Sequence, residues 1–201
     1  MGWNFYNASG ELQINDGGVQ ADSAVFTGNV DLGSNLLVGN AGSTGIAISA
    51  NGEVNMAAQP CVLAYNSASD DNVTGAGTEV TIDFNTEVKD QNADFASDTL
   101  TAPVTGQYLI TFNVEVRGIT SSGTLHQWRI KASNRSIYQQ YGSYASAPSG
   151  QMGGAMAAIV DMDADDTCTI TLVANGESSN VQDINGQDAT QTSYFSAQLL
   201  S

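Results

Sequence analysis

Four closely spaced aspartates are the strongest candidate for metal chemistry in the sequence: Asp161, Asp163, Asp165 and Asp166. Carboxylate oxygens are the ligands that calcium prefers. A calcium loop of the EF-hand type needs glycine at its sixth position and glutamate at its twelfth, whereas this stretch has Asp166 and Leu172 there. Aspartate is also common in turns between strands. The pattern therefore favours a solvated turn and no cofactor, and it leaves calcium as the minor alternative.

Nucleophilic catalysis has few residues to work with. His126 is the only histidine, and the two cysteines, Cys61 and Cys168, lie far from it and from each other in the sequence. Because no nucleophile motif accompanies them, we expect His126 to be a strand residue or a subunit contact. Both cysteines stand in strand-like runs, which favours buried free thiols over a disulfide. The chain is predicted not to be an enzyme. Paired carboxylates that cleave polysaccharide remain an alternative.

A tyrosine-rich stretch, "IYQQYGSYASAPSGQMGG", is the clearest candidate for recognition and contains Tyr138, Tyr141 and Tyr144. Exposed tyrosines combine a large contact area with a polar tip, which suits binding of a glycan or a protein. The alternative is that Tyr138 packs in the core or at a subunit interface. Two polar stretches, 67–77 and 175–189, are expected to be long surface loops and are alternative recognition sites.

The charge of the chain limits its partners. Five basic and 21 acidic residues give a formal net charge of −16, and the first basic residue is Lys89. Such a chain repels a phosphate backbone and an anionic bilayer, so nucleic-acid binding is disfavoured. No apolar run reaches the 18 residues of a membrane-spanning candidate, so no membrane insertion is expected.

Strand-like segments separated by turn signals position these candidates. They fall at 61–66, 78–84, 100–101, 106–116, 125–132, 136–141, 154–162, 167–174 and 193–200. No stretch has a sustained helical period. Regularly spaced short strands without helices predict an all-β sandwich or barrel, with a jelly roll as one form.

The segment "TAPVTGQYLITFNV" (101–114) predicts a turn followed by a half-buried central strand. Pro103 suits a turn, and Gly106 is expected to adopt a backbone conformation that other residues avoid. Apolar residues then take every second place, so that one face of the strand is apolar. That face comprises Tyr108, Ile110, Phe112, Val114 and Val116.

Residues 1–58 differ from the rest because they are glycine-rich and lack Lys and Arg. Within them, "IAISANGEVNM" predicts two short strands around an Asn51-Gly52 turn. Their apolar residues argue against a flexible linker, and strands so short need partners from other chains. We expect a thin β shaft built from several chains, followed by a second domain over 59–201.

The segment "FASDTLTAPVTGQYLITFNV" (95–114) resembles the signature of the complement C1q globular head and the related tumour-necrosis-factor-like jelly rolls. In that signature an aromatic residue precedes a short strand and the pattern Ala-Pro-x-x-Gly-x-Tyr. "AAIVDMDADDTCTITLV" resembles the strand, acidic turn and strand of the same family. "SYFSAQLL", with Phe195, resembles its terminal strand, although Ala197 and Gln198 replace the usual glycine and aromatic. Trp128 stands where a middle strand is expected.

This resemblance implies a jelly-roll sandwich of about ten strands in two sheets, a tight homotrimer, binding through exposed loops and no enzymatic activity. The N-terminal segment is similar to the shafts of bacteriophage fibres. Together these resemblances predict a trimeric fibre or decoration protein on a virion surface. Its knob would bind a host-surface glycan or protein, and its N-terminal segment would bind other virion proteins. The alternative is a secreted, extracellular C1q-like recognition module.

Overall fold

A computed structural model describes residues 46–142 and 150–201. These residues form strands and no α-helix. The strands are β1 (Ile46–Ile48), β2 (Val54–Met56), β3 (Cys61–Tyr65), β4 (Ala68–Thr74), β5 (Glu79–Thr81), β6 (Thr86–Asp90), β7 (Phe95–Ala96), β8 (Thr99–Thr101), β9 (Gly106–Arg117), β10 (Leu125–Ala132), β11 (Ser136–Tyr141), β12 (Met152–Met162), β13 (Thr167–Asn175), β14 (Gln182–Gln187) and β15 (Tyr194–Leu199).

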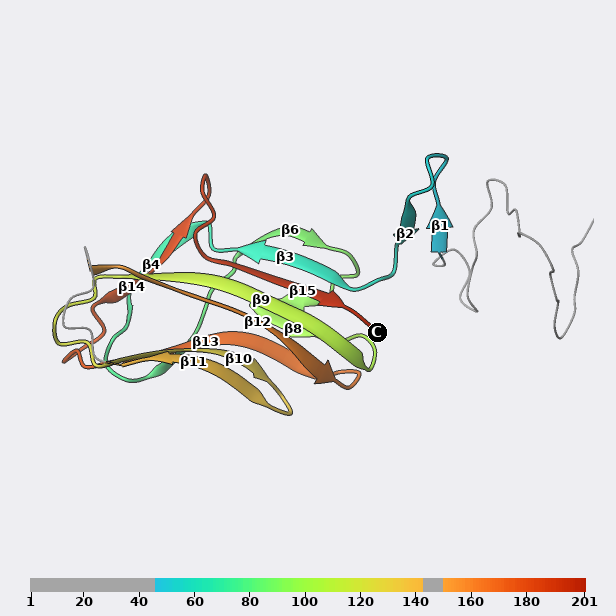
Figure 1. Cartoon of the computed structure of the whole chain (residues 1–201). Helices are drawn as coiled ribbons and strands as arrows, with labels where there is room; N and C mark the ends of the chain where they lie inside the picture. Colours follow the sequence, from blue (N-terminus) through green and yellow to red (C-terminus); the bar gives the residue numbers. More distant parts are fainter. Residues whose placement is uncertain (1–45, 143–149) are drawn as a thin grey trace, which may run out of the picture.

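Two antiparallel sheets pack face to face (Figure 1). The seven-stranded sheet has the order β4-β14-β9-β15-β3-β6, with β12 paired to the other edge of β9. The six-stranded sheet has the order β11-β10-β13-β8-β7, with β5 also paired to β13. The prediction of an all-β jelly-roll sandwich is confirmed. No helix in the described ranges is long and apolar enough to span a membrane.

Strand β9 is central to the seven-stranded sheet, as the alternation of its sequence predicts. Its apolar face, from Tyr108 to Val116, is completely or almost completely buried. The hydroxyl of Tyr108 donates a hydrogen bond of 2.7 Å to the carbonyl oxygen of Val104, in the exposed bend that contains Pro103. This bond satisfies the one polar atom of an otherwise apolar side chain.

The aromatic residues of the family signature meet between the sheets. Phe195 of β15 lies 5.2 Å from Phe95 of β7 and 5.8 Å from Phe84, measured between ring centroids. Phe112 and Trp128 are buried in the same core. Because Phe95 and Phe195 come from different sheets, their stacking joins the two layers.

Gly106 has a different role from the one predicted. Its φ lies outside the left-handed region, so it does not provide an unusual backbone conformation. An added β-carbon would overlap the carbonyl oxygen of Ser201 and lie 2.6 Å from Cδ1 of Leu199. The backbone of Gln107 also bonds to Leu200 and Ser201. Glycine is needed here because the C-terminal segment crosses directly over it.

The two polar stretches expected to be loops contain strands, and this expectation is wrong. β4 lies within 67–77 and β14 within 175–189, and the two pair with each other with register shifts. Polar contacts tie them together: Asp183 accepts a hydrogen bond from the backbone N–H of Asn72, and Asn185 from the hydroxyl of Ser69. Their sequences lack apolar alternation because side-chain hydrogen bonds supplement core packing here.

The predicted hairpin around Asn51 and Gly52 is confirmed as β1 and β2. Gly52 has a φ of +89°, which only glycine adopts without strain. Figure 1 shows the hairpin standing apart from the sandwich, at the end where the C-terminus lies. Hydrogen bonds from Gln91 to the carbonyl of Met56 and from Asn92 to that of Ala58 attach it. The remainder of the predicted shaft, residues 1–45, lies outside the described residues.

Candidate ligand-binding face

The outward face of the six-stranded sheet presents polar side chains in register. On β10, His126, Trp128 and Ile130 point into the core, so the residues between them point outward. Arg129 is one of these, and it pairs across the sheet with Tyr138 of β11 on one side and Thr171 of β13 on the other. Tyr138 is 60% exposed. Tyr138 therefore does not pack in the core of the single chain, and its role as a ligand contact or a subunit contact stays a prediction.

Of the other two tyrosines of the predicted cluster, Tyr141 does not lie on this face. Tyr141 packs edge-on against the ring of Trp128, with centroids 5.7 Å apart and an interplanar angle of 85°. Its hydroxyl accepts a hydrogen bond from Gln139. Tyr144 lies outside the described residues. Of the two described tyrosines, Tyr138 is the one that lies on this face.

A network of charged residues organises this face. Glu79 of β5 accepts hydrogen bonds of 2.7 Å from Nη1 of Arg129, 2.7 Å from Nζ of Lys131 and 2.8 Å from the hydroxyl of Thr171. The hydrogen bond from Lys131 is the largest cause that lowers the pKa of Glu79. Glu79 is consequently ionised at neutral pH, and it fixes two cations at defined positions.

A groove of about 300 Å³ runs along β13 beside this network. β5 pairs with β13 at Thr171–Val173 and β8 pairs at Thr167–Cys168, so the edge of β13 at Thr169 lies between them. We call it the threonine groove. It is lined by Glu79, Thr81, Lys131, Ala132, Ser133, Thr167, Thr169 and Thr171. Six of these side chains carry a hydroxyl or an amine that faces the groove's polar interior.

The sequence interpretation missed this groove, although part of its signal was visible. In "TCTIT" the threonines at 167, 169 and 171 alternate with buried Cys168 and Ile170, which marks one face of a strand as a hydroxyl row. Glu79 could not be assigned to that row from the sequence. It reaches the groove only because β5 pairs with β13.

The outward face of the seven-stranded sheet has the opposite character. Its central rows run Ala157–Thr111–Ser196–Leu63 and Ile159–Leu109–Gln198–Cys61, without a charge. We call these eight residues the small-residue face, because half of them are small and the others are larger but uncharged. The small ones are Ala157, Thr111, Ser196 and Cys61. Charged residues lie at its margins, where Arg117 pairs with Glu115 and Arg135 pairs with Asp161. Ile159 is 56% exposed in the single chain, which is unusual for a large apolar residue on an uncharged face.

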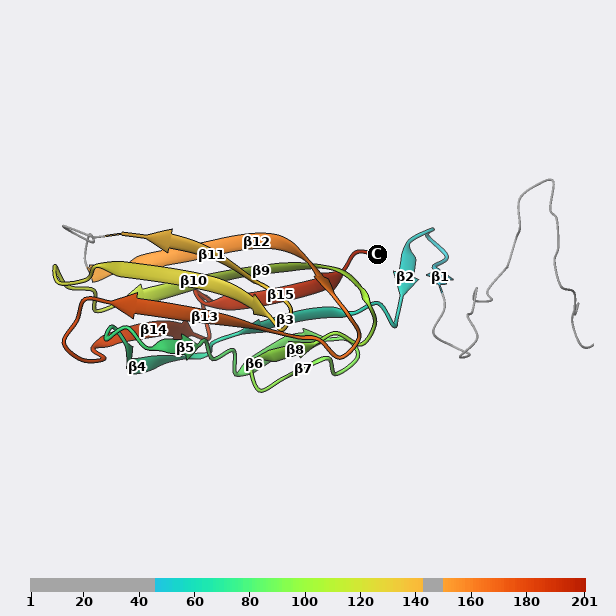
Figure 2. The same cartoon turned by 90° about the horizontal axis from the view of Figure 1, so that it is seen from below.

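One side of the sandwich has open strand edges. Within the described ranges, β12 pairs only with β9, and β11 only with β10. Figure 2 shows β11 and β12 together along one side of the molecule. β12 is eleven residues long and has no charged residue before Asp161. Long apolar edge strands are normally shielded from other chains, and no described strand shields this one.

The acidic turn between β12 and β13 is held by its own hydrogen bonds. Asp166 accepts a bond of 2.7 Å from the hydroxyl of Ser133 and one of 2.9 Å from the N–H of Asp163. The Ser133 bond is the main cause that lowers the pKa of Asp166. Asp165 has a φ of +71°. In the described part of the chain, no group of His, Cys, Asp or Glu side chains has the arrangement of a metal site.

The residues that could do nucleophilic chemistry are placed apart. His126 is a buried residue of β10, where it contacts Oε1 of Gln182 at 2.7 Å and stacks on Trp128. Burial lowers its pKa. Both cysteines are free: Cys168 is buried, which raises its pKa to about 12, and Cys61 is half-buried. The expectation of free thiols is confirmed, with Cys61 less buried than expected.

Comparison with known proteins gives matches among solved structures only. No family model and no curated protein matches the chain. The globular domain of the zebrafish complement 1qA protein is 14% identical, with 71% of this chain and 98% of that chain covered and a TM-score of 0.49. Murine APRIL is 12% identical (71% and 99% covered, TM-score 0.46), and Eiger TNF from S. frugiperda is also 12% identical (71% and 93%, 0.49). The similarity concerns the fold alone.

Proposed function

We propose that the chain is a homotrimeric fibre or decoration protein of a bacteriophage-like virion, whose jelly-roll knob binds a receptor or glycan on the host surface. The carrying observation is the division of the knob into two unlike faces. The small-residue face is uncharged and lies beside the edge of β12, which no described strand covers. The opposite face holds the exposed Tyr138 and the polar network around Glu79. In this proposal the segment before β3 attaches the knob to other virion proteins.

The small-residue face and the open side formed by β11 and β12 support the oligomer. They are different surfaces of one chain, so a contact between them is heterologous. Such a contact builds a ring when its rotation closes, and it does not build a two-fold pair. Small side chains allow close approach of a neighbour, and the neighbour removes Ile159 and the edge of β12 from water. The family resemblance of the motifs supports a ring of three.

Light scattering of the full chain tests the oligomer. We expect the mass of three protomers for the native chain and of one protomer for Ala157→Arg, because the substitution places an unpaired charge in a buried interface. Thr81→Arg, on the opposite sheet, is the matched control and should keep the native mass. A monomeric native chain, or an Ala157→Arg variant with unchanged mass, would contradict the proposal.

Binding of the intact protein to host cells and to an array of surface glycans tests recognition. Saturable binding without shortening of the glycan supports a non-enzymatic recognition protein. Loss of the bound glycan's length during incubation would instead favour the polysaccharide-degrading alternative. Absence of binding to both cells and glycans would contradict the recognition part of the proposal. The homotrimer would still be tested separately by light scattering.

A further inference from the structure

We propose that the threonine groove binds a saccharide that carries an anionic group, and that Lys131 contacts the anionic group. The inference rests on the recognition function proposed above and adds the site and the chemical class of the ligand. It depends on three features: the hydroxyl groups of the groove, the exposed ammonium group of Lys131 and the neighbouring aromatic ring.

Hydroxyl groups give the groove its polar lining. The Thr171 hydroxyl is bound to Glu79 and that of Ser133 to Asp166. Among the described residues, the hydroxyls of Thr81 and Thr169 have no hydrogen-bond partner. Each can donate one hydrogen bond and accept two, which matches the paired donor and acceptor character of sugar hydroxyls. Their χ1 angles are restricted by β-branching and their backbones by the sheet, so little freedom is lost on binding.

The groove is lined by one of the few cations in a strongly acidic chain, Lys131. The chain carries −16, yet two cations surround the single carboxylate of Glu79. Arg129 is committed, because Nη1 donates to Glu79 and Nε donates to Gln127 over 2.6 Å. Within the described residues, Nζ of Lys131 donates one hydrogen bond, to Glu79, and an ammonium group has three donors in all. Its side chain is 47% exposed against 29% for Arg129. Lys131 is therefore the cation available to a carboxylate or sulfate.

Tyr138 adds an apolar surface next to the groove. It lies two strands from Thr171, across Arg129, which corresponds to about 10 Å at the usual spacing between strands. Its exposed ring offers a flat face for the C–H face of a sugar ring, and its hydroxyl offers a polar tip. A ligand longer than one sugar unit can reach both the groove and Tyr138. A free inorganic anion is too short to contact the groove and Tyr138 together, whereas an oligosaccharide can contact both.

The test uses the full chain on an array that pairs each saccharide with and without its carboxylate or sulfate group. We expect binding to the acidic members, weakening as salt rises, and about tenfold weaker binding by Lys131→Gln, as for loss of one charge-assisted hydrogen bond. Thr169→Val keeps the size of the side chain without its hydroxyl and should also weaken binding. Lys131→Arg keeps the positive charge, so this variant should retain most of the binding.

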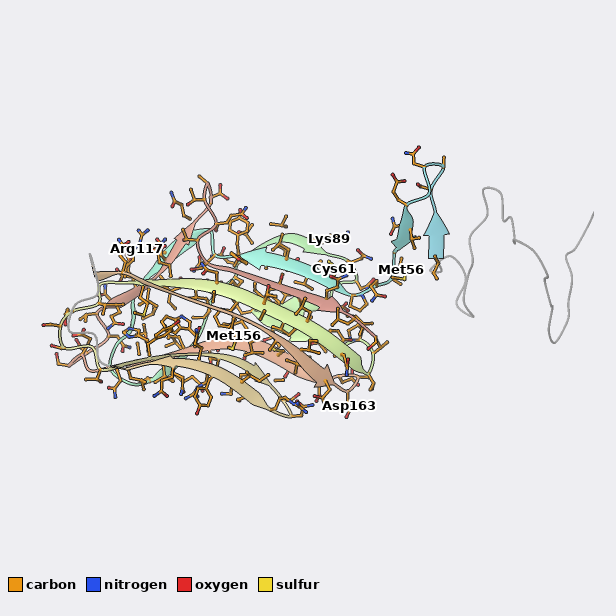
Figure 3. The ribbon with its side chains drawn as sticks, viewed as in Figure 1. Met56, Cys61, Lys89, Arg117, Met156 and Asp163 are labelled. Atoms are coloured by element: carbon orange, nitrogen blue, oxygen red, sulfur yellow. The ribbon has the colours of Figure 1, made fainter. Side chains whose placement is uncertain are left out.

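Lys89→Gln is the matched control, since Lys89 lies on β6 of the other sheet (Figure 3). This variant should bind the acidic saccharides with the affinity of the native chain. Far-ultraviolet circular dichroism and light scattering confirm that each variant keeps fold and mass. The inference would be overturned if Lys131→Gln bound as well as the native chain, or if the native chain bound neutral and acidic saccharides equally. Either result would leave the proposed recognition function intact. Binding of free sulfate without any saccharide would overturn it as well.

Discussion

Gly154 of β12 lies directly against the indole ring of Trp128 of β10, across the two sheets. A β-carbon at Gly154 would come 2.8 Å from Cγ of Trp128 and closer still to Cδ2 and Cε2. The indole is fully buried and cannot move aside. We therefore expect Gly154→Ala to lower the free energy of unfolding by about 1–3 kcal/mol, the usual cost of overpacking.

Gly153→Ala is the control for this prediction. Its added β-carbon would meet only Oδ1 of Asn113, at 3.9 Å. Its effect should stay within about 0.5 kcal/mol. Guanidinium denaturation at one fixed protomer concentration measures both variants. If both variants lowered the free energy of unfolding equally, the contact with Trp128 would not be the cause of the destabilisation.

Stability should fall below neutral pH because of His126. Burial lowers its pKa in the folded state, whereas the unfolded chain has a value of about 6.5. The unfolded state then binds more protons, so the contribution is fully present above about pH 6.5 and is lost as pH falls towards the folded pKa. We expect the melting temperature to decrease between pH 7.5 and pH 5.

His126→Gln separates this effect from the carboxylates, because it removes the titrating group and leaves an amide beside Gln182. The carboxyl groups of Asp70, Asp94 and Asp98, whose pKa values are raised mainly by burial, remain in both proteins. The decrease between pH 7.5 and pH 5 should be smaller in the variant. Parallel melting curves for the two proteins would rule His126 out as the source.

Cys168 should resist thiol reagents in the folded chain. Its pKa of about 12 leaves almost no thiolate at pH 8, and its sulfur is buried. Treatment with iodoacetamide followed by peptide mass mapping should find Cys168 unmodified without denaturant and modified in guanidinium. Cys61, half-buried on the other sheet, is the internal reference. Modification of Cys168 at equal rates in both conditions would contradict its placement in the core.

Gly52→Ala should weaken the hairpin and spare the sandwich. No atom lies within 4 Å of the added β-carbon, so the cost comes from the φ of +89° alone. It should be about 1 kcal/mol, as for other residues forced into the left-handed region. Amide hydrogen exchange should accelerate in β1 and β2 and stay unchanged in β9. Faster exchange throughout the chain would mean that the hairpin stabilises the whole knob.

The sequence predicted those parts of the fold in which burial alternates strictly along the strand. β9 was found because every second residue is apolar, and β10 was also expected as a strand. Phe95 and Phe195 were named only as parts of the family resemblance, and the structure places both in the core. β4 and β14 were not found, because polar bonds such as that between Ser69 and Asn185 leave no apolar period. The role of Gly106 was misassigned because the close approach of Ser201 is a tertiary contact between residues far apart in the sequence.

The candidate site was predictable only in part, for a related reason. Tyr138 could be proposed as an exposed residue but not separated from a core or subunit contact. Tyr141 lies three positions further along β11 and therefore on the opposite face, against Trp128. The groove depends on the pairing of β5 with β13, which joins Glu79 to Lys131 across 52 positions of the chain. No local pattern records such a pairing.

The threonine groove is lined by residues of the six-stranded sheet, whereas Figure 1 shows the hairpin beyond one end of the sandwich. If three knobs close around an axis through their small-residue faces, the grooves point radially away from that axis. A flat cell surface approached head-on would meet none of them. Attachment would then require the fibre to lie on its side with one or two grooves engaged, so avidity would come from neighbouring fibres on the particle.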